Sequence, residues 1–313
     1  MSRTGLVAML VAAEVLIVGI AVAAIGGGRY NATGGGPMFA SGMHPIDFAA
    51  KAIAPVAVGD SPHVAIDDPD SRVEVSPSQD GQVHVKDLTS YRGATFSKSP
   101  LAQLTVERTA DGVRIARPGS NGIHIEIFGY YDQRIEVDVP VGAHIDIARC
   151  SGADITGING GVAVKSQDGH ITLTNLRGTV DAFSGDGYIE ATGVHGDSIT
   201  LKSNDGHVGL QDVAAATINA HSADGRIYGE NVAVGRDGTI STGDGSIVLG
   251  LASGADLTVD ASTGDGSITV DGDRMQEEDS DSTHHTIRLG NGSGSLHVSS
   301  NDGSIHITTN GAH

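Results

Sequence analysis

Aspartates at regular spacing are the side chains that most suggest chemistry in this chain. Asp-Gly steps recur at intervals of 18, 19, 19, 20, 21 and 37 residues. Their aspartates are Asp168, Asp186, Asp205, Asp224, Asp244, Asp265 and Asp302. One such step per turn of a repeating fold would place the carboxylates about 4.8 Å apart, where neighbours repel by ~0.9 kcal/mol in water. Either solvent and turn hydrogen bonds or bound cations must offset that repulsion.

Calcium is the cation that such a row would select, because it takes six to eight oxygen ligands. Asp186, Asp205 and Asp224 are the candidate ligands, between adjacent turns. The calcium-binding repeat G-G-x-G-x-D is absent, and this absence favours turn construction over metal binding as the role of the row. We expect no other cofactor.

A second candidate metal site is the pair His284 and His285, which follows an acidic run at residues 277–281. Imidazole and carboxylate groups are common metal ligands. The alternative is a solvated insertion between two repeats, and the polar composition around the pair favours it.

Motifs of catalysis are missing from the sequence. It has no G-x-S-x-G, H-E-x-x-H or P-loop, and its G-x-G steps at Gly185, Gly243 and Gly264 lead into no helix. Polysaccharide lyases also use parallel β-helices, with charged side chains and aromatic platforms on one sheet. Here Lys165 and Lys202 are the only aligned cations, and aromatic residues make up 4% of the chain. We therefore expect no catalytic residue, and a carbohydrate-active β-helix enzyme is the alternative.

Composition points to many turns joined by short strands. The 313 residues include 45 glycines and no tryptophan. The net charge of -19 repels phosphate backbones, so nucleic acid is excluded as a partner. Cys150 is the single cysteine, which excludes an intramolecular disulfide and predicts a buried, inert thiol.

The N-terminal segment, residues 1–28, reads as a membrane anchor. Residues 6–25 form an apolar run interrupted by Glu14 and Gly19, and 20 residues suit one membrane span. Small residues near Ala23 leave cleavage open as the alternative to an uncleaved signal anchor. We expect a single pass in the cytoplasmic membrane, with the remaining chain on the periplasmic or extracellular side. Residues 29–62, rich in glycine and proline, are predicted to be a flexible linker in which residues 46–53 could form a short helix.

Alternating apolar residues between 63 and 149 predict an irregular β section that covers one end of the repeats. From residue 150 to 313 the repeat is regular. A hydroxyl residue stands two positions before each aspartate of the row, and a β-branched aliphatic stands three positions after it. Apolar residues lie an even number of positions before the aspartate and an odd number of positions after it. The alternation therefore slips by one residue there, so each Asp-Gly step is a corner between two sheets. We expect the glycine there to adopt positive φ and the aspartate to bond a backbone amide two residues on.

The predicted fold is thus all-β: a parallel β-solenoid of two short strands per coil of about 19 residues, preceded by an irregular β segment and one transmembrane helix. The Ser or Thr before each corner has inward parity and should satisfy buried turn groups. The interval of 37 residues is expected to hold two coils, the inner one degenerate near residues 291–295.

Two segments resemble a known family. The strand at residues 137–142, Val-Asp-Val-Pro-Val-Gly, precedes a Ser-x-Asp-Gly-x-Ile repeat, as at residues 184–189. Over residues 63 to 310 the chain is similar to the bacterial DUF4097 family of adhesin-like, or toastrack, domains. The resemblance implies a β-solenoid outside the cytoplasmic membrane, acting as an adhesin or as an assembly platform associated with envelope-stress membrane proteins. It carries over no catalytic residue.

The function expected from these observations is a membrane-anchored scaffold or adhesin. Its partners would be the membrane, through residues 6–25, and an envelope or cell-surface protein. The oligomeric state is left open.

Overall fold

The computed structural model describes residues 44–47, 51–95, 103–118, 126–272, 275–280 and 282–309. In these ranges every regular element is a β-strand, which confirms the all-β fold class. Among the same residues no helix has the length and apolar character needed to cross a membrane. The predicted anchor at residues 1–28 lies outside the described residues.

Three short strands occupy part of the segment 29–62, which was predicted to be a linker without regular structure. They are β1 (His44–Asp47), β2 (Lys51–Ala52) and β3 (Val56–Ala57). Both β2 and β3 pair antiparallel with β6 (Gln82–Asp87), while β1 pairs with β7 (Ser90–Thr95), which also pairs with β10 (Glu126–Asp132). The linker prediction, with its short helix at residues 46–53, was wrong for these strands. Edge strands are held by backbone hydrogen bonds to strands that come later in the sequence, and this leaves little signal in local composition.

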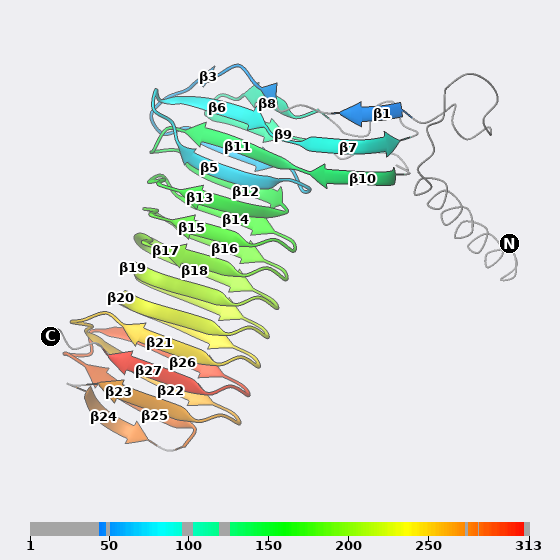
Figure 1. Ribbon diagram of the computed structural model, residues 1–313. Helices are drawn as coiled ribbons and strands as arrows, with labels where there is room; N and C mark the ends of the chain where they lie inside the picture. The colour runs from blue at the N-terminus through cyan, green and yellow to red at the C-terminus, as the bar shows by residue number, and fades with distance from the viewer. Residues whose placement is uncertain are drawn as a thin grey trace, which may run out of the picture. The chain divides into compact units, whose positions relative to one another are not determined.

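The remaining strands form a solenoid of two sheets of mainly parallel strands joined at corners (Figure 1). Sheet 1, which precedes the Asp-Gly corner, stacks in the order β8 (Thr105–Arg108), β9 (Gly112–Ala116), β4 (His63–Asp67), β12 (His144–Cys150), β14 (Val162–Ser166), β16 (Val180–Ser184), β18 (His195–Ser203), the second halves of β19 (Val208–Ser222) and β20 (Ile227–Thr242), β26 (Gly294–Ser300), β22 (Leu257–Thr263), β25 (His284–Leu289) and β24 (Met275–Ser280). Sheet 2, which follows the corner, stacks in the order β6, β11 (Arg134–Val139), β5 (Arg72–Pro77), β13 (Gly152–Thr156), β15 (Ile171–Thr174), β17 (Ile189–Thr192), the first halves of β19 and β20, β21 (Ile247–Leu251), β27 (Ile305–Thr309) and β23 (Ile268–Gly272). The predicted two-strand coil is present, although β19 and β20 continue through the far corner without a break.

Residues 63–149 share both sheets with the repeats. Their strands are threaded out of sequence order, since β4 lies between β9 and β12, and β5 lies between β11 and β13. The antiparallel strand β8 lies at the outer end of sheet 1, and at the same end of sheet 2 the antiparallel strand β6 is followed by β2 and β3. This section therefore extends the solenoid as well as covering its end.

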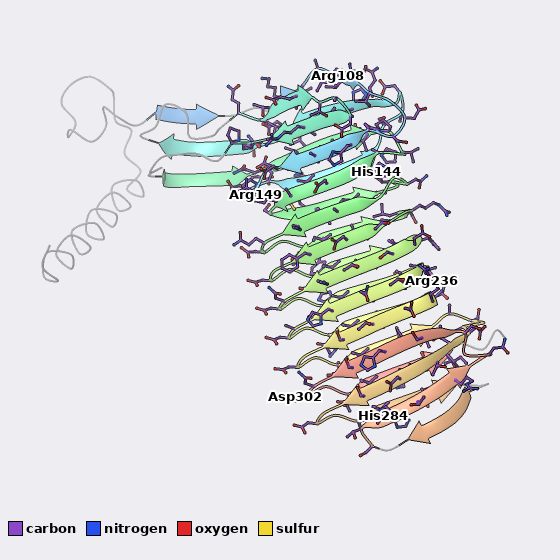
Figure 2. The ribbon with its side chains drawn as sticks, turned by 180° about the vertical axis from the view of Figure 1, so that it is seen from behind. Arg108, His144, Arg149, Arg236, His284 and Asp302 are labelled. Carbon is purple, nitrogen blue, oxygen red and sulfur yellow. The ribbon has the colours of Figure 1, made fainter. Side chains whose placement is uncertain are left out.

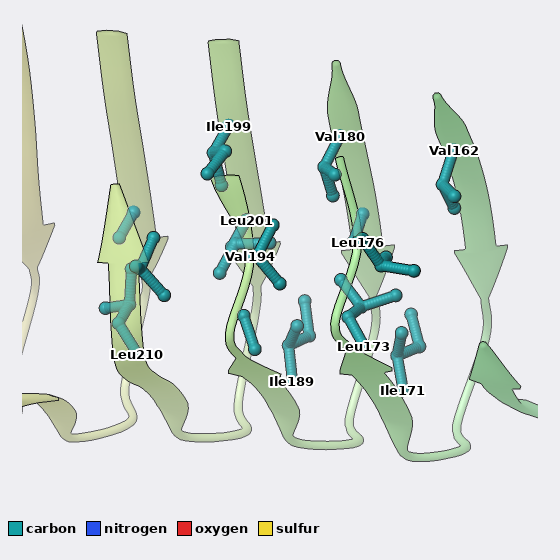
Figure 3. Packing of buried hydrophobic residues seen from close by; sticks show 14 of the residues in the cluster. Val162, Ile171, Leu173, Leu176, Val180, Ile189, Val194, Ile199, Leu201 and Leu210 are labelled. Carbon is teal, nitrogen blue, oxygen red and sulfur yellow. The ribbon is translucent and has the colours of Figure 1, made fainter. Parts of the chain in front are cut away.

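The core is a stack of aliphatic side chains between the sheets. Val162, Val180 and Ile199 follow one another along sheet 1, and Ile171 and Ile189 line the same core from sheet 2, closer to the corner (Figure 3). All five are almost fully buried. Each parallel pairing places like residues in register, so every coil adds a similar layer of apolar contact.

Each Asp-Gly corner is held by the hydroxyl that precedes it. Ser203 Oγ donates to the carbonyl oxygen of Gly187 in the previous coil at 2.9 Å and accepts from the amide of Gly206 at 3.0 Å. The hydroxyl residues at the seven corners are all buried, as their parity predicted. They are Ser166, Ser184, Ser203, Ser222, Thr242, Thr263 and Ser300. They link each coil to the next.

The corner glycines are required for a reason other than the one we predicted. Among the described residues with φ between +20° and +160°, none is a glycine of the seven Asp-Gly corners, so the expectation of positive φ was wrong. A Cβ on Gly206 would instead overlap the carbonyl group of Gly187. The corner therefore selects glycine for close approach between coils.

One row of left-handed positions lies at the far corner of successive coils. They are Gly157, Asn175, Gly193, Asp212 and Asn231, one per coil, with φ between 52° and 72°. Glycine, asparagine and aspartate are the residues that tolerate this conformation best. The residue types at this position therefore follow from the backbone angle.

The last coil is inserted between two earlier ones. Ser300 of β26 pairs with Thr242 of β20 on one side and with Thr263 of β22 on the other. The strands β24 and β25 form an antiparallel pair that lies against β22 at the end of sheet 1. The prediction of a degenerate coil near residues 291–295 was wrong, because the interval of 37 residues contains this hairpin and the return of the chain.

A buried ion pair occupies the corner position of the first coils. Arg117 Nε lies 2.9 Å from Asp68 Oδ2, and another guanidinium nitrogen lies 3.0 Å from Asp87 Oδ1. Asp68 is fully buried and Ser71 donates to it at 2.8 Å. Burial on its own raises the pKa of Asp87, but hydrogen bonds from Thr89 and Arg117 outweigh it and hold that pKa below its usual range.

Replacing a corner glycine should destabilise the solenoid. We expect Gly206→Ala to lower the free energy of unfolding by about 1–3 kcal/mol, because the new Cβ overlaps a carbonyl of the neighbouring coil. In the same coil, the atom closest to a Cβ on Gly209 would be Glu190 Cγ at 3.5 Å, an ordinary contact. Gly209→Ala is thus the matched control and should change stability by less than ~0.5 kcal/mol. Denaturant unfolding followed by circular dichroism compares the two, and equal effects would contradict the close-approach explanation.

The ion pair should make the solenoid sensitive to acid. Because the folded-state pKa of Asp87 lies below the unfolded value of about 3.9, its contribution is complete above about pH 4 and is lost as pH falls through the folded-state pKa. Asp87→Asn should lower stability at pH 7 by about 1–3 kcal/mol and flatten the loss of stability between pH 5 and pH 3. Asp181→Asn, at an exposed carboxylate on β16, is the control. Parallel pH profiles for both variants would argue against this role of Asp87.

Candidate functional site

One edge of the solenoid repeats the same exposed polar group in every coil. We call it the Asp-Gly edge: the seven corner aspartates together with the residue that follows each corner glycine. All seven aspartates are exposed. Figure 2 shows Asp302 at this edge and Arg236 at the opposite one. In stacking order the row is Asp168, Asp186, Asp205, Asp224, Asp244, Asp302 and Asp265.

These carboxylates make no side-chain hydrogen bond or ion pair with any residue that the structure describes. The expected bond from each aspartate to the amide two residues on is not among the hydrogen bonds of the described residues. The corner hydroxyl accepts from the amide of the corner glycine, as Ser222 does from Gly225 at 2.9 Å. The carboxylates therefore point to solvent, available to another molecule.

Asp186, Asp205 and Asp224, the candidate calcium ligands, belong to this row, one per coil. Within the described ranges no three histidine, cysteine, aspartate or glutamate side chains are grouped closely enough to hold a metal ion. Calcium binding between adjacent coils stays a prediction.

The pair His284 and His285 lies on β25, at the end of sheet 1, and so does not lie between two coils. Neighbouring residues on a strand point to opposite faces, so the pair does not converge on one point. The structure brings His284 to Asp260 instead, with Nδ1 3.5 Å from Oδ1, and His297 approaches the other carboxylate oxygen at 3.4 Å. The sequence did not suggest this grouping, because the three residues come from three strands.

Planar side chains stack beside the aspartates. The ring centroids of His170 and Tyr188 are 3.6 Å apart with an interplanar angle of 16°, and those of Tyr188 and His207 are 4.8 Å apart at 15°. Arg226 holds the same position in the next coil, and the coils beyond have serine there. Comparison of the residues two positions after each aspartate could have revealed this ladder.

A hollow of about 740 Å³ opens where the ladder changes from large side chains to serine. Its lining is His207, Asp224, Arg226, Tyr228, Asp244, Gly245, Ser246 and Gly303. Tyr228 is 47% exposed, and its hydroxyl donates to Glu230 Oε2 at 3.1 Å. This hydrogen bond raises the pKa of Tyr228. The hollow combines an aromatic ring, carboxylates and a guanidinium.

On a second charged surface, the carboxylates form ion pairs with basic side chains of the same surface. On β5, β11 and β13, Glu74, Glu136 and Asp154 accept from Arg134, Lys86 and Arg72 at 3.3, 3.0 and 2.7 Å. Because these carboxylates already have cationic partners, the face offers less to a ligand than the Asp-Gly edge does.

Cys150 is buried, as predicted, and occupies the corner position one coil before Ser166. Burial raises the pKa of its thiol to about 11. A thiol that stays protonated at neutral pH is a poor nucleophile.

The fold resembles several solved structures. One is described as a putative adhesin from Bacteroides fragilis, with 14% identity, covering 83% of this chain and 97% of that chain at a TM-score of 0.44. Others are a putative adhesin from Parabacteroides merdae (10%, 83% and 96%, TM-score 0.42) and a putative lipid binding protein from Parabacteroides distasonis (12%, 84% and 95%, TM-score 0.42). None of the curated proteins matches the chain.

The resemblance noted from the sequence is confirmed by a family model. The model described as Toastrack DUF4097 matches residues 62–308, which is most of the chain. Its limits include both sheets of the solenoid and the Asp-Gly edge. The chain belongs to the Toastrack DUF4097 family.

Proposed function

We propose that this protein is an interaction scaffold, anchored in the cytoplasmic membrane by residues 6–25, that presents its solenoid to an envelope or cell-surface partner. The observation that carries the proposal is the difference between the two sides of each corner. The inward hydroxyls are fully used in linking coils, whereas the outward aspartates have no partner in the described chain. A repeated, unpaired edge is suited to recognition.

The same geometry favours binding over catalysis. The large planar side chains of the edge stack on one another. Each coil contributes one carboxylate of the aspartate row, so these polar groups are spread along a line. Catalysis by a general acid paired with a general base needs two such groups placed around one reacting bond of the substrate. Polysaccharide turnover by the purified protein, abolished by a single substitution on one face, would overturn the proposal in favour of the enzyme.

The anchor is tested by deleting residues 1–28. We expect the full-length protein to remain in the membrane fraction after alkaline carbonate extraction, because its apolar run spans the bilayer. The deletion variant should be recovered in the soluble fraction with unchanged strand content by circular dichroism. Soluble full-length protein would contradict the anchor.

Partner binding is tested with a photo-crosslinking amino acid placed in the full-length chain in native membranes. One variant carries it at Asp205, on the Asp-Gly edge, and the control carries it at Arg236, on the opposite edge (Figure 2). We expect a discrete adduct from position 205 and none from position 236. No adduct at position 205, or the same adducts from both positions, would argue against the edge as the interaction surface.

A further inference from the structure

We propose that the hollow at Arg226 and Tyr228 binds a pyranose ring of a neutral glycan, with Tyr228 as the platform. This inference rests on the proposed function, because it names the class of ligand that the Asp-Gly edge recognises. The hollow lies where the residue after the corner glycine changes from a large planar side chain to serine. Its volume of about 740 Å³ is large enough to accept a pyranose ring.

The ring of Tyr228 is positioned to receive a sugar. In the row of outward residues on sheet 2, the register places Gly209 before Tyr228 and Val248 after it. Gly209 contributes no side chain beside the tyrosine, and the Tyr228 side chain lines the hollow and is 47% exposed. The hydrogen bond from the Tyr228 hydroxyl to Glu230 holds the ring in place. An exposed, fixed aromatic ring provides the apolar surface on which the C–H face of a pyranose packs.

Polar groups around the ring supply both donors and acceptors. Arg226 Nε donates to Ser246 Oγ at 3.1 Å, which fixes the guanidinium, and its terminal nitrogens have no acceptor among the described residues. Asp224 and Asp244 line the same hollow with unpaired carboxylates. A carboxylate accepts from neighbouring hydroxyls and a guanidinium donates to hydroxyl and ring oxygens, so one sugar can pair with both kinds of charged group in the hollow.

Charge selects against the other classes of ligand. Two carboxylates repel phosphate, sulfate and acidic sugars, whereas the guanidinium of Arg226 disfavours a lysine-rich or arginine-rich peptide. The alternation of acidic and basic groups over a short distance suits a neutral molecule rich in hydroxyls. We therefore commit to a neutral glycan, and a basic peptide is the competitor in the test.

The experiment measures binding of the full-length protein, in detergent micelles, to immobilised neutral hexasaccharides of glucose, mannose, galactose and N-acetylglucosamine. We expect at least one of them to bind with Kd below about 1 mM, and Tyr228→Ala to weaken binding about tenfold or more, as loss of an aromatic stacking partner does. Tyr228→Phe keeps the ring and should retain most of the affinity. Phe183→Ala is the matched control, because Phe183 is also an exposed aromatic residue, at 37%, but lies on β16 outside the hollow.

Three results would overturn the inference: no hexasaccharide binds, Tyr228→Ala and Phe183→Ala weaken binding equally, or a lysine-rich peptide binds the edge and no sugar does. Failure here is distinguishable from failure of the proposed function. A discrete protein adduct at position 205 without glycan binding would retain the scaffold and remove only the sugar, whereas no adduct and no binding would remove both.

Discussion

The solenoid depends on the close approach of successive coils at the Asp-Gly corner. There the backbone of one coil comes so near to the carbonyl of the next that no Cβ fits, and a buried hydroxyl bridges the same two coils. The short distance fixes the register of both flanking strands, because a shift of one residue would move the hydroxyl out and an exposed polar group in. Aliphatic packing fills the interior, but the corner determines which residues face it.

The buried residue at the corner has the same position in every coil, but its chemical type varies. In stacking order this row of corner residues begins with Arg117 and Asp68, passes through Cys150 and continues with hydroxyl residues. The ion pair, the thiol and the hydroxyls satisfy the same requirement: a buried polar side chain at the corner needs a hydrogen-bond partner in the adjacent coil. The irregular sequence of residues 63–149 thus conceals a continuation of the repeat.

Local pattern predicted much of this fold, and its failures have specific causes. The inward hydroxyls and aliphatics followed from parity alone, since side chains alternate along a strand. The backbone angle at the corner could not be predicted in this way, because a glycine is required both where φ is positive and where another backbone approaches closely. Only the position of the neighbouring coil distinguishes the two cases. The position of the last coil could not be predicted either: β26 carries the same corner residues as the other coils and fits any of them, so its place is set by the hairpin β24–β25. The stacked ladder and the hollow arise from side chains 18 to 20 residues apart, so a pattern of neighbouring residues does not contain them.

The inserted coil also changes what proteolysis would do. In an ordinary linear repeat, cleavage near the last coil would shorten the stack by one layer and leave a single new edge. Here residues 294–309 form an internal layer, between β20 and β22 in one sheet and between β21 and β23 in the other. Removing these residues would leave unpaired strand edges on both sides of the gap. It would also separate β22, β23 and the hairpin β24–β25 from the rest of the stack. Residues 294–309 are thus the layer that holds two parts of the solenoid together.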